Sequence, residues 1–102
     1  MNPDWLQPQW PAPSRVKALC TSRNGGASMG AYDSFNLGDH VGDAPAAVVA
    51  NRAALARMLG VRPVFLSQVH GAKVMALDAA SADGQVADAA ITSQAGVACT
   101  IM

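Results

Sequence analysis

The histidines are the side chains of this sequence best suited to proton transfer or metal binding at neutral pH. His70 stands between Gln68 and Gly71 beside a predicted turn, where its ring can reach a pocket at a sheet edge as a metal ligand or a proton carrier. The alternative is a hydrogen-bonded histidine at the end of a hairpin, because a single histidine without a partner three or four residues later is weak evidence for zinc. His40 is expected to be structural, since a helix start disfavours a cationic ring.

Two further polar residues could contact a substrate. Arg23 lies in a glycine-rich turn whose exposed amides could cradle an anion, with the guanidinium supplying the positive charge. The turn has neither the P-loop lysine pattern nor a dinucleotide-binding fingerprint, so a solvated turn arginine is the alternative. Asn36 lies between Phe35 and Leu37, where it either braces the loop or points into a site.

The remaining candidates are acids and thiols. All seven acidic residues are aspartates, and Asp88 is the one most enclosed by small apolar neighbours. Such enclosure favours a shifted pKa, although a structural aspartate bonded to backbone amides fits equally well. Cys99 lies in an apolar run without adjacent cations and is expected to be a core thiol. Cys20 and Cys99 are 79 positions apart with no secretion signal, so both are expected to be reduced.

The helix that must position part of this chemistry is the clearest predicted element. It runs from about 44 to 59, with Asp43 as the candidate N-cap, Pro45 in the first turn and Gly60 just after the end. The pattern predicts an apolar side formed by Val48, Leu55, Met58 and Leu59. Most of the polar residues Asn51, Arg52 and Arg57 are expected to lie elsewhere on the helix.

Strand formers follow the helix. Residues 64–70 and 73–78 are predicted to form a hairpin with a type II′ turn at Gly71-Ala72, which would put His70 at the hairpin's end. Residues 79–86 are predicted to be a loop, and 87–93 and 96–102 further buried strands. Before the helix, 15–20 is a predicted first strand. Residues 1–14, with four prolines, Trp5 and Trp10, fit an extended arm held by its aromatic rings.

Composition excludes several classes of function. Seven basic and seven acidic residues give no net charge and no basic cluster, so neither nonspecific nucleic-acid binding nor attraction to an anionic membrane is expected. No apolar run approaches the ~20 residues of a membrane-spanning helix, and the first residues do not resemble a secretory signal. A cytoplasmic location is therefore expected.

The size of the chain and the composition of its core predict that it is part of a longer protein. The 102 residues amount to one small domain, and 21 of the hydrophobic residues are alanine, which buries little surface. The chain also stops inside an apolar stretch, 96–102. We therefore expect residues 1–102 to be a single unit, the front part of a longer protein that supplies the missing C-terminal part of its domain.

Taken in order, these segments resemble a known family. The stretch TSRNGGASMGAYDSFNLGDHVGD, the pair Asn51-Arg52, the block SQVHG, the triplet ADA around Asp88 and the end GVACTIM look like the YfiH-like family. This family is also called the laccase-domain, multicopper polyphenol oxidase or zinc-dependent purine nucleoside phosphorylase family. The resemblance covers about residues 10–102 and implies a layered α/β (α+β) fold with mixed β-sheets.

The resemblance also implies a metal site and an activity. His70 matches the first zinc ligand, whereas the family's ligand cysteine and second histidine would follow Met102, so Cys99 is not a ligand. The implied activities of a full-length member are phosphorolysis of purine nucleosides and of methylthioadenosine, and deamination of adenosine. Its partners would be small molecules, a purine nucleoside and phosphate. We expect Arg23 to contact phosphate or ribose, and Asn36 and Gln68 to orient the substrate.

Three alternatives accompany that reading. Copper-dependent phenol oxidation is attached to the family by name, although one histidine without a nearby Cys-His cluster does not favour a multicopper site. Hydrolytic editing of peptidoglycan precursors would use the same pocket. A chain that truly ended at Met102 would instead be an inactive scaffold fragment, because one protein ligand of three cannot hold zinc tightly.

Overall fold

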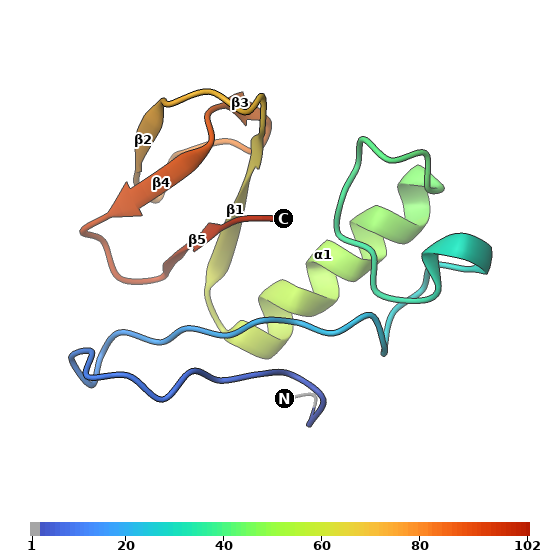
Figure 1. Ribbon diagram of the computed structural model, residues 1–102, viewed down its shortest axis with the longest axis horizontal. Helices are drawn as coiled ribbons and strands as arrows, with labels where there is room; N and C mark the ends of the chain where they lie inside the picture. The colour runs from blue at the N-terminus through green and yellow to red at the C-terminus, as the bar shows by residue number, and fades with distance from the viewer. Residues whose placement is uncertain (1–2) are drawn as a thin grey trace. The chain divides into compact units, whose positions relative to one another are not determined.

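A computed structural model of the chain describes residues 3–102, which form two compact units (Figure 1). The first unit ends at Ala54, and the second runs from Leu55 to Met102. The helix α1 (Pro45–Leu59) crosses this boundary as one continuous element. None of the described helices is long and apolar enough to cross a membrane.

The first unit is mostly irregular chain before α1, with one short 3-10 helix, η1 (Gly30–Tyr32). The predicted strand at 15–20 is wrong, because only an isolated antiparallel bridge between Leu6 and Cys20 forms there. Their backbone N–O distances are 2.9 and 2.8 Å. After Leu6, the arm that would pair with this strand has prolines at 8, 11 and 13. Proline has no N–H to donate, so the ladder cannot extend beyond the bridge.

Two aromatic rings form the apolar centre of the first unit. Trp5 and Phe35 are 7% and 4% exposed, and their ring centroids lie 5.8 Å apart in a stacked arrangement. Offset stacking adds about 0.5 to 1.5 kcal/mol to the burial of two such rings. Trp10 is 54% exposed. Of the two tryptophans expected to hold the arm, only Trp5 does so.

Helix α1 lies where the sequence predicts it, with one shift at its start. The carbonyl of Ala44 accepts the N–H groups of Ala47 and Val48, so Ala44 and not Asp43 occupies the N-cap position. Asp43 lies one residue earlier, and its carboxylate accepts the N–H of Ala44 at 2.7 Å. At the other end, Gly60 adopts a φ of +70° and donates to Ala56, as expected of a glycine that ends a helix.

The buried face of α1 differs from the predicted one. Val48, Asn51 and Leu55 are 3%, 1% and 3% exposed. These residues are three and four positions apart and therefore share one side of the helix. The expectation that Asn51 lies off the apolar side is wrong. Its side-chain amide is buried and hydrogen-bonds the loop that precedes the helix.

The second unit contains two small parallel sheets. In the first sheet, β1 (Arg62–Ser67) pairs on one side with β3 (Gln85–Val86) and on the other with β5 (Val97–Thr100). In the second, β2 (Val74–Leu77) pairs with β4 (Ala89–Thr92). An α/β fold is thus confirmed. Every pair between the described strands is parallel, whereas mixed sheets were expected.

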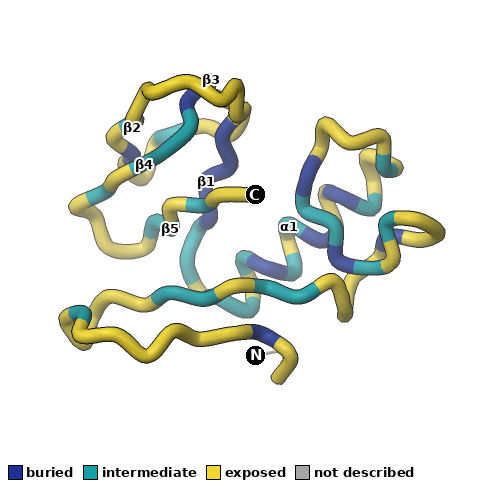
Figure 2. The backbone as a smooth tube through the Cα atoms, in the orientation of Figure 1, coloured by how far each residue is buried: buried dark blue, intermediate teal, exposed yellow. Residues whose placement is uncertain are grey.

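The predicted hairpin between 64–70 and 73–78 is wrong, because β1 and β2 belong to different sheets. Residues 63–66 of β1 are all buried, as the dark segment of β1 in Figure 2 shows. A continuous apolar run is typical of a central strand in a parallel sheet, whose two faces are both covered. The chain from 68 to 73 is therefore a connection between two sheets.

The C-terminal strands are shorter and less buried than predicted. Within 87–93 and 96–102, only β4 and β5 are extended, and Ile91 and Ile101 are 62% and 70% exposed. The end of the predicted loop 79–86 forms β3. Cys99 is exposed on β5 and is not a core thiol. Its pKa is nevertheless raised by partial burial, which opposes a nucleophilic role as predicted. Both cysteines are free, as predicted.

Candidate functional site

The turn after β1 carries two of the predicted site residues, Gln68 and His70, and both are exposed. His70 has a φ of +59°, the one left-handed backbone conformation of a non-glycine residue among the described positions. A side chain other than glycine adopts this conformation at a cost of about 1 to 2 kcal/mol. Other contacts must therefore hold the turn in place.

The carboxylate of Asp88 supplies these contacts. Its Oδ1 accepts the backbone N–H groups of Val69 at 3.1 Å and of His70 at 2.6 Å, and its Oδ2 accepts the N–H of Gly71 at 2.7 Å. Asp88 follows β3 and precedes β4, and its own N–H donates to the carbonyl of Lys73 at 3.1 Å. One side chain thus binds three consecutive amides of the His70 turn.

The electrostatics of Asp88 follow from this geometry. Partial desolvation raises its pKa, but the amides of Gly71, His70 and Val69 and the nearby imidazole favour the charged form. The net result is a pKa below the ordinary value of 3.8. Asp88 therefore shows both of the features considered for it, a shifted pKa and bonds to backbone amides, and the amides contribute to the downward shift.

The imidazole of His70 fits one position in a metal site. It is exposed, and within residues 3–102 its ring takes part in no hydrogen bond. Neutral imidazole is a common zinc ligand. The same residues contain no group of three or more His, Cys, Asp or Glu side chains placed to hold a metal. The described chain therefore offers one donor, and a tight zinc site requires others.

Arg23 lies in the first unit, on an exposed loop that is closed by hydrogen bonds to its own backbone. Its carbonyl accepts the N–H groups of Ser34 and Phe35, each at 2.8 Å. Its Nε donates to the carbonyl of Asp33 at 2.9 Å. The guanidinium is thus oriented by one bond, and its exposed face is available to an anion.

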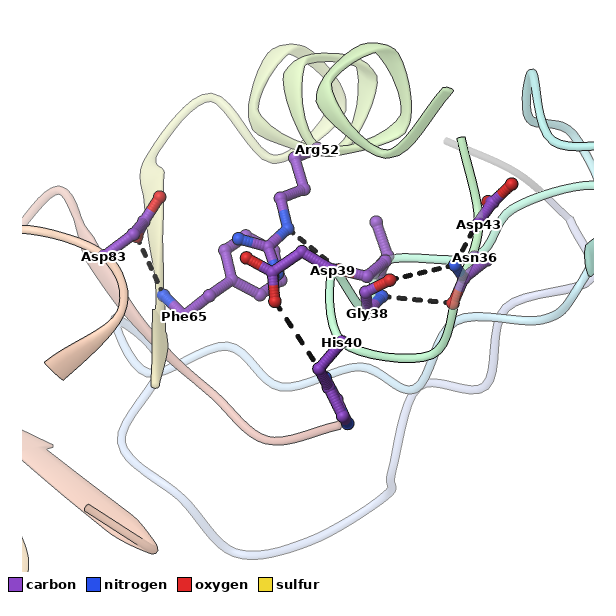
Figure 3. A network of polar contacts seen from close by, with 9 residues as sticks. Asn36, Gly38, Asp39, His40, Asp43, Arg52, Phe65 and Asp83 are labelled. Atoms are coloured by element: carbon purple, nitrogen blue, oxygen red, sulfur yellow. Dashed lines mark hydrogen bonds and ion pairs between the residues drawn. The ribbon is translucent and has the colours of Figure 1, made fainter. Parts of the chain in front are cut away.

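Asn36 braces its loop. Its Nδ2 donates to the carbonyl of Gly38 at 3.0 Å and to Asp43 Oδ2 at 3.1 Å, and its Oδ1 accepts the N–H of Gly38 at 3.1 Å (Figure 3). Both amide protons are engaged, so the side chain has only acceptor capacity left for a ligand. Asp43 also accepts the hydroxyl of Ser28 at 2.5 Å.

Asn51 joins the separate parts of this loop and was not predicted as a site residue. Its Oδ1 accepts the N–H of Ala27 at 2.7 Å. Its Nδ2 donates to Ser28 Oγ at 2.9 Å and to the carbonyls of Asn36 at 2.8 Å and Ser34 at 3.3 Å. The sequence signal for this role was a polar side chain on the same helical side as Val48 and Leu55.

His40 is exposed on the loop between Asn36 and α1. Its Nδ1 lies 3.9 Å from Asp39 Oδ1, which is also 3.7 Å from an Arg52 nitrogen (Figure 3). The Nε of Arg52 donates to the carbonyl of Leu37 at 2.8 Å. The ion pair of Arg52 with the exposed Asp39 carboxylate contributes about 0 to 1 kcal/mol. The structural role expected of His40 stays a prediction.

The predicted site residues thus fall into two groups, one in each compact unit. Arg23 and Asn36 belong to the loop system that Asn51 organises in the first unit. Gln68 and His70 lie on the turn that Asp88 binds in the second.

Two solved structures share this fold. A protein of Neisseria meningitidis, NMB0706, superimposes with a TM-score of 0.86 at 42% sequence identity, covering 92% of this chain and 39% of the other. YlmD of Geobacillus stearothermophilus superimposes with a TM-score of 0.82 at 32% identity, covering 91% of this chain and 39% of the other. The arrangement of elements is thus that of the N. meningitidis protein and YlmD.

The sequence comparisons define the family. The family model described as multi-copper polyphenol oxidoreductase laccase matches residues 17–102, and the chain belongs to this family. It is 50% identical over 98 residues to the purine nucleoside phosphorylase PA4543 of Pseudomonas aeruginosa, covering 96% of this chain and 40% of the relative. It is 43% identical over 99 residues to the purine nucleoside phosphorylase YfiH of Escherichia coli, covering 95% and 41%. The predicted YfiH-like family is confirmed, and the chain spans about 40% of the length of these relatives.

Proposed function

We propose that this sequence is the N-terminal portion of a zinc-dependent purine nucleoside phosphorylase. The observation that carries the proposal is the 50% identity, over nearly the whole chain, to a relative named for that activity. Phosphorolysis joins a phosphate oxygen to the ribosyl C1 carbon and breaks the bond from that carbon to the purine nitrogen. The products are ribose 1-phosphate and the free base. Methylthioadenosine phosphorolysis and adenosine deamination belong to the same proposal, as does a cytoplasmic location.

The proposal gives His70 the role of one zinc ligand. An exposed ring on a turn held by three hydrogen bonds is a suitable donor, because a ligand fixed in place loses little freedom on binding. The remaining ligands would come from the length of the relatives that this chain does not span. Bound zinc would act as a Lewis acid and would lower the pKa of a water molecule.

Three other residues are proposed to bind or orient the substrate. The exposed guanidinium of Arg23 suits phosphate or the ribose hydroxyls, since arginine binds oxyanions through a planar fork. Gln68 is exposed two residues before His70 and would hydrogen-bond the nucleoside. Asn36 would act mainly through the shape of its loop, because its amide protons are already engaged. None of these roles requires nucleic acid or a membrane.

The test is an assay of the protein purified from its source organism with inosine, adenosine or methylthioadenosine, each with and without phosphate. Phosphate-dependent release of the free base is the expected result, and His70→Ala is expected to abolish it together with bound zinc. The matched control is His40→Ala, which removes an exposed imidazole from the first unit and is expected to keep both. Zinc content and turnover unaffected by His70→Ala would refute the role of His70.

Phenol oxidation is the second candidate, because the matching family model is described by that activity. An assay distinguishes phenol oxidation from phosphorolysis. Copper-loaded and zinc-loaded protein are each incubated with a phenolic substrate under air. Oxygen consumption with the copper form and no phosphorolysis with either would favour oxidation. Muramyl-peptide precursors assayed in parallel would detect hydrolytic editing.

A further inference from the structure

Asp88 differs from the other aspartates of the second unit in the number of amides that it binds. Asp83 accepts the N–H of Phe65 at 2.9 Å, and Asp78 Oδ1 accepts that of Ala80 at 2.8 Å. Asp88 accepts three in succession, reaching from one connection of the chain to another over 17 to 19 residues. Three charge-assisted bonds from one carboxylate to consecutive amides hold the turn more tightly than the single amide bonds of Asp78 and Asp83 hold theirs.

The three bonds act on the residue whose conformation is least favourable. The central amide belongs to His70, whose φ is +59°, and its bond to Oδ1 is the shortest of the three at 2.6 Å. An amide direction depends on the backbone angles, so binding the N–H groups of Val69, His70 and Gly71 together fixes the angles between them. The Cβ of His70 then leaves the turn in one direction.

The neighbouring glycine fits the same arrangement. A Cβ atom built on Gly71 would lie 3.3 Å from Asp88 Oδ2, which is closer than ordinary van der Waals contact. A side chain larger than glycine at this position would therefore press on the carboxylate. Ala87, immediately before Asp88, is fully buried and anchors this part of the chain to the fold, where its N–H donates to Ser67 at 3.2 Å.

We propose that Asp88 is the positioning residue of His70: it holds the turn in the one backbone conformation that aims the imidazole at the metal. This inference rests on the proposed function only in taking His70 as a ligand. Asp88 hydrogen-bonds the peptide groups of the turn, and its interaction with the imidazole is through charge alone, so it orients the ring through the backbone, in the way that hydrogen bonds outside a metal site orient its ligands. Loss of such a partner lowers metal affinity by about 10- to 100-fold.

The experiment measures zinc affinity of the full-length protein by competition with a chelator, for Asp88→Ala and for the control Asp83→Ala. Both substitutions remove a carboxylate that accepts backbone N–H, one for Asp83 and three for Asp88, but only Asp88 binds the His70 turn. We expect affinity to fall about 10- to 100-fold for Asp88→Ala. It should stay within about threefold of wild type for Asp83→Ala, since Asp83 binds no part of that turn. In Asp88→Ala, hydrogen exchange at the amides of Val69, His70 and Gly71 should also become faster.

A second variant keeps the test decisive if Asp88→Ala fails to fold. Asp88→Asn has the same volume and retains one accepting oxygen, but it sets an NH2 group against one or more of the amides. It is expected to lose less zinc affinity than Asp88→Ala and more than Asp83→Ala. Asp88 variants with wild-type affinity, or equal losses in the Asp88 and Asp83 variants, would overturn the inference. Unchanged zinc affinity in His70→Ala would instead refute the role of His70 as a zinc ligand. That result is distinguishable from unchanged affinity in the Asp88 variants, which would refute only the positioning role of Asp88.

Discussion

The side-chain oxygen of Asn51 accepts the backbone N–H of Ala27 across 24 positions of sequence. The bond joins a helix residue that is 1% exposed to an exposed loop, and the same amide group also binds Ser28, Ser34 and Asn36. The buried amide of Asn51 thus ties the loop system that carries Arg23 to the helix. Its hydrogen bonds replace secondary structure, which this stretch lacks apart from η1.

Asn51→Ala is expected to lower the free energy of unfolding by about 2 to 4 kcal/mol, because it leaves several buried polar groups without partners. Chemical denaturation monitored by tryptophan fluorescence measures the loss, since Trp5 stacks on Phe35 in the same unit. The matched control is Arg57→Ala on the exposed side of α1, which should change stability by less than about 0.5 kcal/mol. Equal stability of the two variants would contradict this account of Asn51.

Gly26→Ala tests the close approach within the same loop. A Cβ at this position would lie 2.2 Å from the carbonyl oxygen of Ser34 and 2.6 Å from Asn51 Oδ1. Backbone cannot yield cheaply at such distances, so we expect a loss of about 3 kcal/mol or more and a loss of the Arg23 loop conformation.

The control for Gly26 is Gly30→Asn in the same loop. Gly30 has a φ of +63° and open space where a Cβ would stand, and asparagine tolerates this conformation. Its substitution should cost less than about 1 kcal/mol. A Gly26→Ala protein as stable as the Gly30→Asn protein would show that the close approach is absent in solution.

How much the sequence could predict depended on whether the signal was local. Helix α1 carries its own start and stop, Pro45 and Gly60, and its bounds followed from them. The hairpin was wrong because its evidence, two strand-forming runs joined by Gly71-Ala72, says nothing about the partner of each strand. Continuous burial of 63–66 is the feature that favours parallel pairing, yet apolar runs occur in both kinds of sheet.

The candidate site shows the same division. His70 and Arg23 were identified from residue type and neighbours, which a sequence displays directly. The spacing of Asn51 from Val48 and Leu55 marks a polar residue on the buried side of the helix, but its partners are 15 to 24 positions away, and no local pattern identifies them. For Asp88, enclosure by alanines predicted a shifted pKa or bonds to backbone amides. Only the fold shows that these amides are those of the His70 turn.

Acid should unfold the protein partly through Asp43. The hydroxyl of Ser28 lowers the pKa of Asp43, partial desolvation opposes this, and Asn36 and Ala44 lower it further, so the net shift is below 3.8. The unfolded chain therefore binds this proton more readily than the folded one does. Stability from Asp43 is present above the ordinary pKa and is lost as the pH falls through the lowered value.

Asp43→Asn is thus expected to flatten the dependence of unfolding free energy on pH below about 4. Urea unfolding measured at several pH values gives this slope. Asp39→Asn is the control, because the Asp39 carboxylate is 66% exposed and its ion pair with Arg52 is long, at 3.7 Å. The interpretation is wrong if the slopes of the Asp43 variant and the wild type coincide.

The mass of the protein in its source organism is a further prediction. The chain amounts to 10.4 kDa and spans about 40% of the length of its relatives. If it is the N-terminal portion of such an enzyme, intact mass spectrometry should give more than twice that value. A native mass near 10.4 kDa would leave His70 without further ligands and favour a structural role for the chain.

Arg23→Ala should separate the two reactions proposed for the full-length protein. Phosphate is a substrate of phosphorolysis and takes no part in deamination. Loss of a charge-assisted contact to it should therefore lower kcat/KM for inosine phosphorolysis at least tenfold, and raise the KM for phosphate. Adenosine deamination should change less than about threefold. The substitution also removes the bond from Arg23 to the carbonyl of Asp33, but this disturbs the loop only locally. Arg15→Ala, which removes an exposed arginine of the same unit, should alter neither reaction. Equal losses of both activities in Arg23→Ala would show that the residue acts through the ribose or through the loop and not through phosphate.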